Sequence, residues 1–319
     1  MSLPLTPPVK PQLALSRKQL PVGEDYSYEV KLDGFRCLAF VDGHDVFLQS
    51  RNGKPLGRYF PELTFPAGRY VLDGEIVVRD ADGREDFDAL GQRIHPAVSR
   101  VQLLAVQTPA AYVAFDLLAH EQHALLELAF AERRAALEGL LAGDAFARAP
   151  VELMPTVASA AEAEQWLEHA EGAIAKERSA PYRPGERKGM AKVKRVRTID
   201  AVVVGWRPGK EPGTVGALIL GLYDGPQLRT VGHCSGLSAA EKKRLVGFLA
   251  PYQSGERGSA DPSRWSAEKD LEWVALRPEL VVEIDFDHVS AGRIRHGAKL
   301  RRWREDKPSL QCTFDQLYT

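Results

Sequence analysis

The chain has 319 residues, of which 44% are hydrophobic and 27% are charged, a balance typical of a globular protein with about two domains. The 42 basic and 43 acidic residues leave a formal net charge of -1, which excludes a uniformly basic nucleic-acid binder but allows a locally basic one. No apolar run is long enough for a transmembrane helix, and the N-terminus lacks the apolar core of a secretion signal. Three widely spaced cysteines form neither a disulfide framework nor a zinc motif, which indicates a reducing compartment.

The N-terminal segment is rich in proline up to about residue 24 and predicts an extended arm that includes a short helix from Ser16. Strands are then predicted from apolar alternation and β-branched runs, at residues 26–30, 36–41, 44–49, 69–78 and 111–118. The dipeptide Asp42-Gly43 separates two of these strands and favours a β-hairpin.

Three helices are predicted, over residues 121–143, 159–172 and 237–252. The second opens with Ser159 and Glu162, a capping-box pair in which the hydroxyl accepts a free N–H and the carboxylate reaches back to the cap. Ser238 and Glu241 open the third helix in the same way. These helices lie between strands, so the first part of the chain is expected to be mixed α+β.

The pattern changes after about Arg197. Short strands with glycine or proline breaks surround a single helix, which is typical of a small β-barrel such as an OB-fold. We therefore expect two domains, residues 1–196 and residues 197–319.

The segment from Glu29 to Arg36 reads EVKLDGFR, in which Lys31 ends a strand, a glycine turn follows and an arginine comes five positions after the lysine. This KxDGxR pattern resembles that of covalent nucleotidyltransferases, whose lysine amine attacks the α-phosphate of a nucleoside triphosphate. An amine attacks only in its neutral form, whereas an unperturbed lysine is protonated at pH 7. Neighbouring cations and partial desolvation are therefore expected around Lys31.

Further short segments follow in the order of one family and extend over nearly the whole chain. They are Ser50-Arg51-Asn52-Gly53, Leu72-Asp73-Gly74-Glu75, Phe115 within AYVAFDLL, Glu171-Gly172, Lys192-Val193-Lys194 and Arg304-Glu305-Asp306-Lys307. Each segment has an ordinary structural explanation by itself, but their joint order does not. The chain resembles ATP-dependent DNA ligases of the compact bacterial type, close to the ligase C group and the ligase domain of ligase D.

The resemblance implies a role for each residue of the nucleotide site. Lys31 is the catalytic nucleophile, Arg51 contacts the ribose and Phe115 stacks on the adenine. Glu29 lies two positions before Lys31 on the same face of a strand, and can accept from the exocyclic amine of the adenine. The cations expected to hold the phosphates of ATP are Arg36, Lys192, Lys194, Arg304 and Lys307.

Two carboxylates, Glu75 and Glu171, are hard oxygen ligands suited to Mg²⁺, and Glu75 is also placed near the ribose hydroxyl. The cofactors implied are ATP and Mg²⁺. One departure from the family is Met190, which replaces a tryptophan usually found two residues before the first lysine of the fifth motif. Ala173 and Ala175 are also smaller than is common in the fourth motif.

Two segments are strongly basic. Seven basic residues and one acid lie between residues 183 and 197, and seven basic residues and two acids between residues 293 and 307. Such clusters bind phosphates of any sequence. The residues expected to contact DNA are Arg183, Arg187, Arg195 and Arg197.

The implied fold is an α+β, ATP-grasp-like nucleotidyltransferase domain with antiparallel sheets and flanking helices, followed by the OB-fold domain. The implied function is sealing of nicked duplex DNA in repair, through a lysyl-AMP intermediate and an adenylated 5′-phosphate. A cytoplasmic, nucleoid-associated monomer without membrane association is expected, with Ku-type end-joining or base-excision repair proteins as partners.

Three alternatives remain at this stage. An NAD-dependent ligase is disfavoured because only 30 residues precede Lys31 and three scattered cysteines cannot form a Cys₄ zinc site. An RNA ligase or an mRNA-capping guanylyltransferase shares the lysine motif and the OB partner. The alternative that is not an enzyme is an inactive, OB-containing DNA-binding protein.

Overall fold

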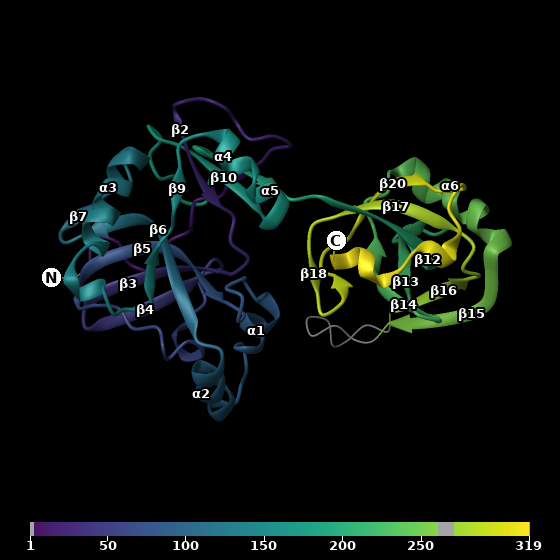
Figure 1. The fold of residues 1–319 in the computed structure, drawn as a ribbon, viewed down its shortest axis with the longest axis horizontal. Helices are drawn as coiled ribbons and strands as arrows, with labels where there is room; N and C mark the ends of the chain where they lie inside the picture. The colour runs from purple at the N-terminus through teal and green to yellow at the C-terminus, as the bar shows by residue number, and fades with distance from the viewer. Residues whose placement is uncertain (1–2, 261–270, 319) are drawn as a thin grey trace. The chain divides into compact units, whose positions relative to one another are not determined.

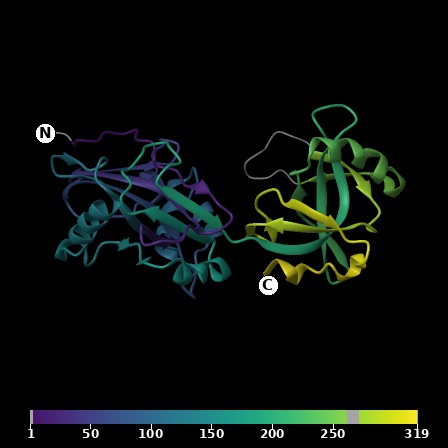
Figure 2. The same cartoon turned by 90° about the horizontal axis from the view of Figure 1, so that it is seen from above.

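The computed structural model describes residues 3–260 and 271–318 and divides into two compact units, Met1–Arg195 and Val196–Thr319 (Figure 1; Figure 2). Each unit has its own apolar core. In the described residues, no helix is long and apolar enough to cross a membrane.

The first unit contains a six-stranded sheet with the order β4-β3-β5-β6-β7, in which β8 pairs parallel to β6. Its strands are β3 (Phe35–Gly43), β4 (Asp45–Ser50), β5 (Gly68–Val78), β6 (Ala110–His120), β7 (His123–Ala124) and β8 (Val151–Leu153). The middles of β3, β5 and β6 are buried on both faces, which explains why their apolar runs are nearly continuous.

A second, five-stranded sheet in this unit has the order β1-β11-β10-β2-β9. Its strands are β1 (Leu15–Ser16), β2 (Tyr26–Val30), β9 (Thr156–Val157), β10 (Gly172–Glu177) and β11 (Met190–Lys194). The helices of the unit are α1 (Phe87–Gln92), α2 (Val98–Gln107), α3 (Phe130–Leu141), α4 (Ala160–Glu164) and α5 (Trp166–His169), with short 3₁₀ turns at Gly57–Tyr59 and Asp144–Phe146. Helix α3 packs on β6 and α1 packs on β5.

The register of each sheet brings distant motifs onto one face. Arg36 on β3 pairs with Glu75 on β5, so their side chains point the same way. In the second sheet Glu29 on β2 pairs with Ile174 on β10, which in turn pairs with Lys192 on β11. Side chains two positions along each strand share these faces, and the two faces therefore carry most of the polar residues that the motifs predict.

The second unit is a curled sheet with the order β14-β13-β12-β16-β15, extended by β17 and β20. Its strands are β12 (Arg197–Pro208), β13 (Val215–Asp224), β14 (Gln227–Cys234), β15 (Gln253–Ala260), β16 (Leu271–Leu276), β17 (Val281–Phe286) and β20 (Lys299–Trp303). Strand β12 pairs with β13 along one edge and with both β16 and β17 along the other, which makes the sheet OB-like.

The remaining elements of the second unit are short, apart from one helix. They are α6 (Ala239–Leu249), the two-stranded pair β18 (Val289–Ser290) and β19 (Arg293–Ile294), and 3₁₀ turns at Ala250–Tyr252, Ser309–Gln311 and Phe314–Tyr318. The mixed α+β class predicted from the sequence is confirmed.

Local signals in the sequence predicted several elements correctly. The Asp42-Gly43 hairpin forms between β3 and β4, with Gly43 in the left-handed region at a φ of 66°. Both capping boxes form: the Ser159 hydroxyl accepts from the N–H of Glu162, and the Ser238 hydroxyl accepts from the N–H of Glu241.

Two predicted helices are wrong in part and a third does not form. The helix expected over residues 159–172 ends at His169, because Gly172 begins β10. The helix expected from residue 121 begins only at Phe130, because residues 123–124 pair with β6 and the N–H of Leu125 donates to the carbonyl of Leu118. No helix forms at Ser16. That residue instead belongs to β1, which adds to the second sheet parallel to β11. Helices α1 and α2 were not predicted.

A substitution at Gly172 tests how closely β10 and β11 approach each other. The φ of Gly172 is 147°, and a Cβ there would lie 2.2 Å from the carbonyl oxygen of Val193. Backbone atoms cannot move aside, so Gly172→Ala should lower stability by about 2 kcal/mol or more. Thermal denaturation would measure the loss. Gly139→Ala is the matched control, since a Cβ inside α3 meets nothing within 4 Å and should be neutral or stabilising. Equal midpoints for the two variants would contradict this account.

Candidate active site

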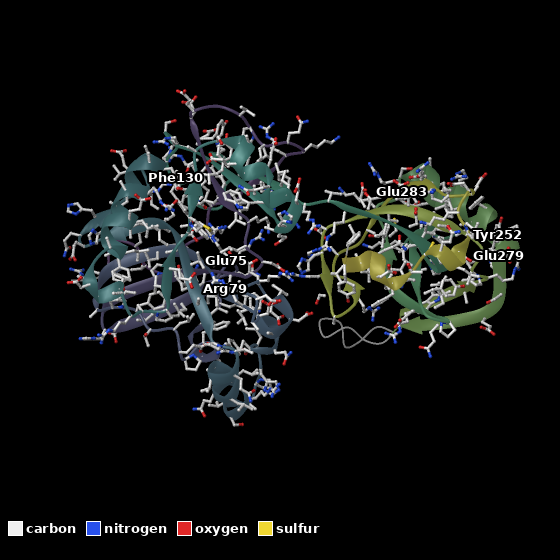
Figure 3. The ribbon with its side chains drawn as sticks, viewed as in Figure 1. Glu75, Arg79, Phe130, Tyr252, Glu279 and Glu283 are labelled. Atoms are coloured by element: carbon white, nitrogen blue, oxygen red, sulfur yellow. The ribbon has the colours of Figure 1, made fainter. Side chains whose placement is uncertain are left out.

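A cavity of about 290 Å³ lies in the first unit and is lined by the polar faces of both sheets and by the arm. Eight residues predicted for the nucleotide site line it: Glu29, Lys31, Arg36, Arg51, Glu75, Phe115, Lys192 and Lys194. The sheet register explains this convergence, because the residues come from β2, β3, β5, β6 and β11 and from the loops that follow β2 and β4. Figure 3 labels Glu75 within this unit.

Lys31 lies immediately after β2, and its backbone N–H donates to the carbonyl of Gly172 at 2.9 Å. Its Nζ is 2.7 Å from Oε2 of Glu171, and only 19% of its side chain is exposed. Nζ of Lys194 is 3.5 Å from the other oxygen, Oε1. The Glu171 carboxylate therefore lies between two ammonium groups.

Positive charge accumulates at the same end of the cavity. Partial burial lowers the pKa of Lys192, and the charges of Lys31, Lys194 and Arg51 lower it further, while Glu171 opposes them. A group of cations that repel one another in a cavity is a site prepared for an anion.

Glu75 is a partly buried carboxyl on β5. Burial raises its pKa to about 7, with Asp73 and Glu171 adding to the rise, whereas Arg36 and Lys31 oppose it. The cavity therefore holds a carboxyl that titrates near neutrality beside a cluster of cations.

A buried hydrogen-bond network fixes the Arg36 side chain. The fully buried carboxylate of Asp73 accepts from Nε and Nη2 of Arg36, both at 2.6 Å, and from the Tyr182 hydroxyl at 2.7 Å. The same hydroxyl accepts from the N–H of Gln12 at 2.9 Å, which ties the arm to the site. The Arg36 guanidinium lies 4.5 Å from the centre of the Phe115 ring.

Two of the residues that line the cavity form a buried ion pair. Nζ of Lys176 donates to Oε1 of Glu29 at 2.8 Å and to the carbonyl of Phe115 at 3.1 Å. Both side chains of the pair are less than a tenth exposed.

The residues predicted to contact DNA do not form one group. Arg187 is exposed and lines the cavity, whereas Arg183 pairs with Glu127 at 3.0 Å. The backbone N–H of Arg195 donates to the carbonyl of Glu171. Arg197 is directed into the second unit, where it donates to the carbonyl of Leu317 at 3.1 Å.

The last two cations of the predicted phosphate site lie in the second unit. Both are held by the buried carboxylate of Asp200, which accepts from Nη1 of Arg304 at 2.9 Å and from Nζ of Lys307 at 2.7 Å.

Comparison with known proteins identifies the family. The model of the ATP dependent DNA ligase domain matches residues 11–194, and that of the ATP dependent DNA ligase C terminal region matches residues 211–307. The chain belongs to the ATP-dependent DNA ligases. This confirms the family that the motifs predicted and identifies the protein as an enzyme that uses ATP.

Full-length relatives support the same assignment. The ligase is 43% identical to DNA ligase C1 of Mycolicibacterium smegmatis, over 100% of this chain and 96% of that protein. It is 42% identical to DNA ligase C of Mycobacterium tuberculosis, over 99% of this chain and 96% of that protein. A solved structure of mycobacterial DNA ligase D complexed with ATP and MES is 28% identical, with a TM-score of 0.53, and covers 96% of this chain and 98% of that chain.

The carboxylates of the site suit Mg²⁺ better than they suit a metal ion whose ligands all come from the protein. Among the described residues, no group of three or more His, Cys, Asp or Glu side chains could hold a metal ion. Mg²⁺ needs only one or two carboxylates when substrate phosphates supply further oxygens. The carboxylates of Glu171 and of the nearby Glu75 meet this requirement, and Oε2 of Glu171 is paired with the Lys31 ammonium at 2.7 Å.

Three residues of the site were missed by the sequence reasoning: Gln12, Tyr182 and Lys176. Gln12 and Tyr182 reach the site through Asp73, and Lys176 reaches it through Glu29. One signal for Lys176 was present, since its position shares a face with Ile174 in a strand whose other residues are mostly small and apolar.

A substitution at Tyr182 tests the buried hydrogen-bond network around Asp73. Tyr182→Phe would leave the N–H of Gln12 without its acceptor and would remove one donor from the Asp73 carboxylate, so we expect a loss of about 2 kcal/mol in the free energy of unfolding. The control is Tyr28→Phe, because the Tyr28 hydroxyl donates to a backbone carbonyl, that of Pro21, rather than to a buried carboxylate. Chemical denaturation of both variants would measure the difference. A Tyr182 variant no less stable than the Tyr28 variant would contradict the network.

Proposed function

We propose that the ligase joins nicked duplex DNA in three steps that begin at Lys31. The amine attacks the α-phosphate of ATP, an N–P bond forms and pyrophosphate leaves with the electrons of the broken P–O bond. AMP then passes to the 5′-phosphate at the nick, and the adjacent 3′-hydroxyl displaces it to close the strand. The observation that carries the proposal is the position of Lys31, at 2.7 Å from Glu171 in a cavity that Lys192, Lys194 and Arg51 make positive.

The other residues that line the cavity are assigned by what their side chains can do. Glu29 accepts from the adenine amine, Phe115 stacks on the base and Arg51 binds the ribose. Arg36, which the Asp73 carboxylate holds in place, binds phosphate together with Lys192 and Lys194. Before it attacks, Lys31 must pass a proton to an acceptor, and Oε2 of Glu171, 2.7 Å from its Nζ, is positioned to take it.

Glu75 and Glu171 are the residues proposed to hold Mg²⁺. Bound there, the ion would neutralise charge on the phosphates of ATP. Glu171 also holds the Lys31 amine through the ion pair, so the same carboxylate orients the nucleophile.

The polymer substrate and the cellular role are also proposals. Arg187 lines the cavity and is exposed, which suits a phosphate of the nicked strand, and we place Arg183, Arg195 and Arg197 in the same role. One relative, from Pseudomonas aeruginosa, is named a multifunctional non-homologous end joining protein and is 33% identical over 96% of this chain. We propose repair of DNA as the role, with Ku-type end-joining or base-excision repair proteins as partners, for a monomer located with the nucleoid.

We further propose that residues 1–196 act as the nucleotidyltransferase domain and residues 197–319 as the OB-fold domain. The two compact units meet within one residue of that boundary, and the two family models lie on either side of it.

The nucleophile can be tested directly. Lys31→Ala should abolish the AMP adduct that survives denaturation, whereas Lys243→Ala, an exposed lysine on α6, should form it at the level of the unmodified ligase. Incubation with labelled ATP, followed by denaturing electrophoresis, gives the measurement. An undiminished adduct in the Lys31 variant would refute the mechanism.

The cations of the second unit should act in the first step only. We expect Arg304→Ala combined with Lys307→Ala to abolish self-adenylation, because these two cations are assigned to the leaving pyrophosphate. The same preparation should still seal a nick whose 5′ end already carries AMP, since that substrate bypasses the loading of Lys31. Equal loss in both assays would mean that these residues serve DNA binding or folding instead.

A further inference from the structure

Lys176 is an almost completely buried lysine that lines the cavity. Only 6% of its side chain is exposed, on a strand that is otherwise apolar along its buried face. Its Nζ donates to Oε1 of Glu29 and to the carbonyl of Phe115, and it lies 4.6 Å from the Phe115 ring centre and 4.7 Å from that of Phe130. Aromatic faces stabilise a cation most where water is excluded. Phe130, at the start of α3, is labelled in Figure 3.

The partner carboxylate is equally buried. Burial raises the pKa of Glu29, and Asp116 raises it further, whereas Lys176 is the strongest of the groups that lower it and Arg134 is the other. A buried carboxylate without a cation takes up a proton rather than remain charged. Among the charged groups around Glu29, Lys176 therefore has the largest influence on whether Glu29 is a carboxylate or a carboxylic acid.

We propose that Lys176 is a positioning residue that makes the ligase select ATP over GTP, by holding the Glu29 side chain in its ionised form and in one orientation. This inference rests on the proposed function, in which Glu29 meets the exocyclic group of the base. It assigns base selection to a residue that does not need to touch the nucleotide.

The hydrogen-bonding capacities of the two bases explain the selection. An ionised carboxylate only accepts hydrogen bonds, so it matches the amine that adenine carries at C6. Guanine carries a carbonyl oxygen at C6. That oxygen and the ionised Glu29 carboxylate are both acceptors, so no hydrogen bond can form between them. A protonated Glu29 could donate to that oxygen, and discrimination would then be lost. Sites built around a specific hydrogen bond reject the analogue that lacks it far more strongly than apolar pockets do.

The geometry fixes orientation as well as charge. Lys176 binds only Oε1, while the carbonyl of Phe115 and the two rings hold the ammonium itself. Glu29 lines the cavity beside Lys31, two positions along the chain. The carboxylate is thereby held at the base end of the cavity while the nucleophile lies at the phosphate end.

The test measures the ratio of AMP adduct to GMP adduct formation, as kcat/KM with labelled ATP and labelled GTP on one preparation. Lys176→Met keeps the length of the side chain but removes its charge, and we expect the ratio to fall by about tenfold or more. Because both nucleotides are assayed on the same protein, a lower folded fraction cancels in the ratio. A ratio equal to that of the unmodified ligase would overturn the inference, because a structural residue would impair both nucleotides alike.

A second comparison remains informative if Lys176→Met does not fold. Glu29→Gln and the double variant Glu29→Gln/Lys176→Met leave no buried carboxylate without its cation. If Lys176 acts through Glu29, the two variants should have the same nucleotide ratio, as expected for a coupled pair in a double-mutant cycle. A further change in the double variant would show that Lys176 contacts the base by itself, which would overturn the positioning role.

The control is another buried ion pair of the same unit. Arg93 is fully buried and paired with Glu62, and neither residue lines the cavity. Arg93→Met should lower stability but leave the nucleotide ratio unchanged; a fall as large as that of Lys176→Met would overturn the inference. Failure of the unmodified ligase to form an AMP adduct would instead refute the proposed function, and the inference would fall with it.

Discussion

The ion pair between Arg36 and the buried carboxylate of Asp73 is the contact on which the candidate site depends. It joins two central strands of the first sheet, and through Tyr182 and Gln12 it reaches the segment before β11 and the N-terminal arm. Breaking such a pair by removing one partner leaves a buried charge, at a cost of about 3–5 kcal/mol. The ion pair therefore joins the walls of the cavity and also fixes Arg36, one of the cations that line it.

Charges in the cavity fall into two classes, which explains how one small space can be both rigid and reactive. Glu29 and Lys176 neutralise each other and are almost completely buried. Around Lys31, the cations Lys31, Lys192 and Lys194 exceed the carboxylates near them, and Lys31 remains partly exposed. A region whose charges are paired binds a ligand through shape and hydrogen bonds, whereas a region with excess positive charge attracts an anion.

What could be predicted from the sequence was mainly local. The hairpin at Asp42-Gly43 and the two capping boxes depend on residues within a few positions of each other, and all three form. The spacing of EVKLDGFR placed Lys31 at the end of a strand because such motifs include their own turn. The family could be inferred since its motifs are short and ordered along the chain.

The rest required contacts between distant residues. Glu29 and Lys176 are 147 positions apart, and Tyr182 is 109 positions from Asp73, so no periodicity could pair them. Pairing with β6 also explains the wrong start of the helix predicted from residue 121, because strand pairing outweighed a favourable helical pattern there. The arm was predicted as extended, but its pairing with β11 depends on the completed second sheet.

That pairing has a consequence for how the chain behaves as a solute. In the second sheet β1 lies at one end of the strand order, directly outside β11. Without it, β11 would present a free row of backbone donors and acceptors, the feature by which sheets of separate molecules join edge to edge. Two residues of the arm, Leu15 and Ser16, cover part of that edge at very low cost in chain length. The proline-rich arm thus occupies part of an edge at which such pairing could otherwise begin.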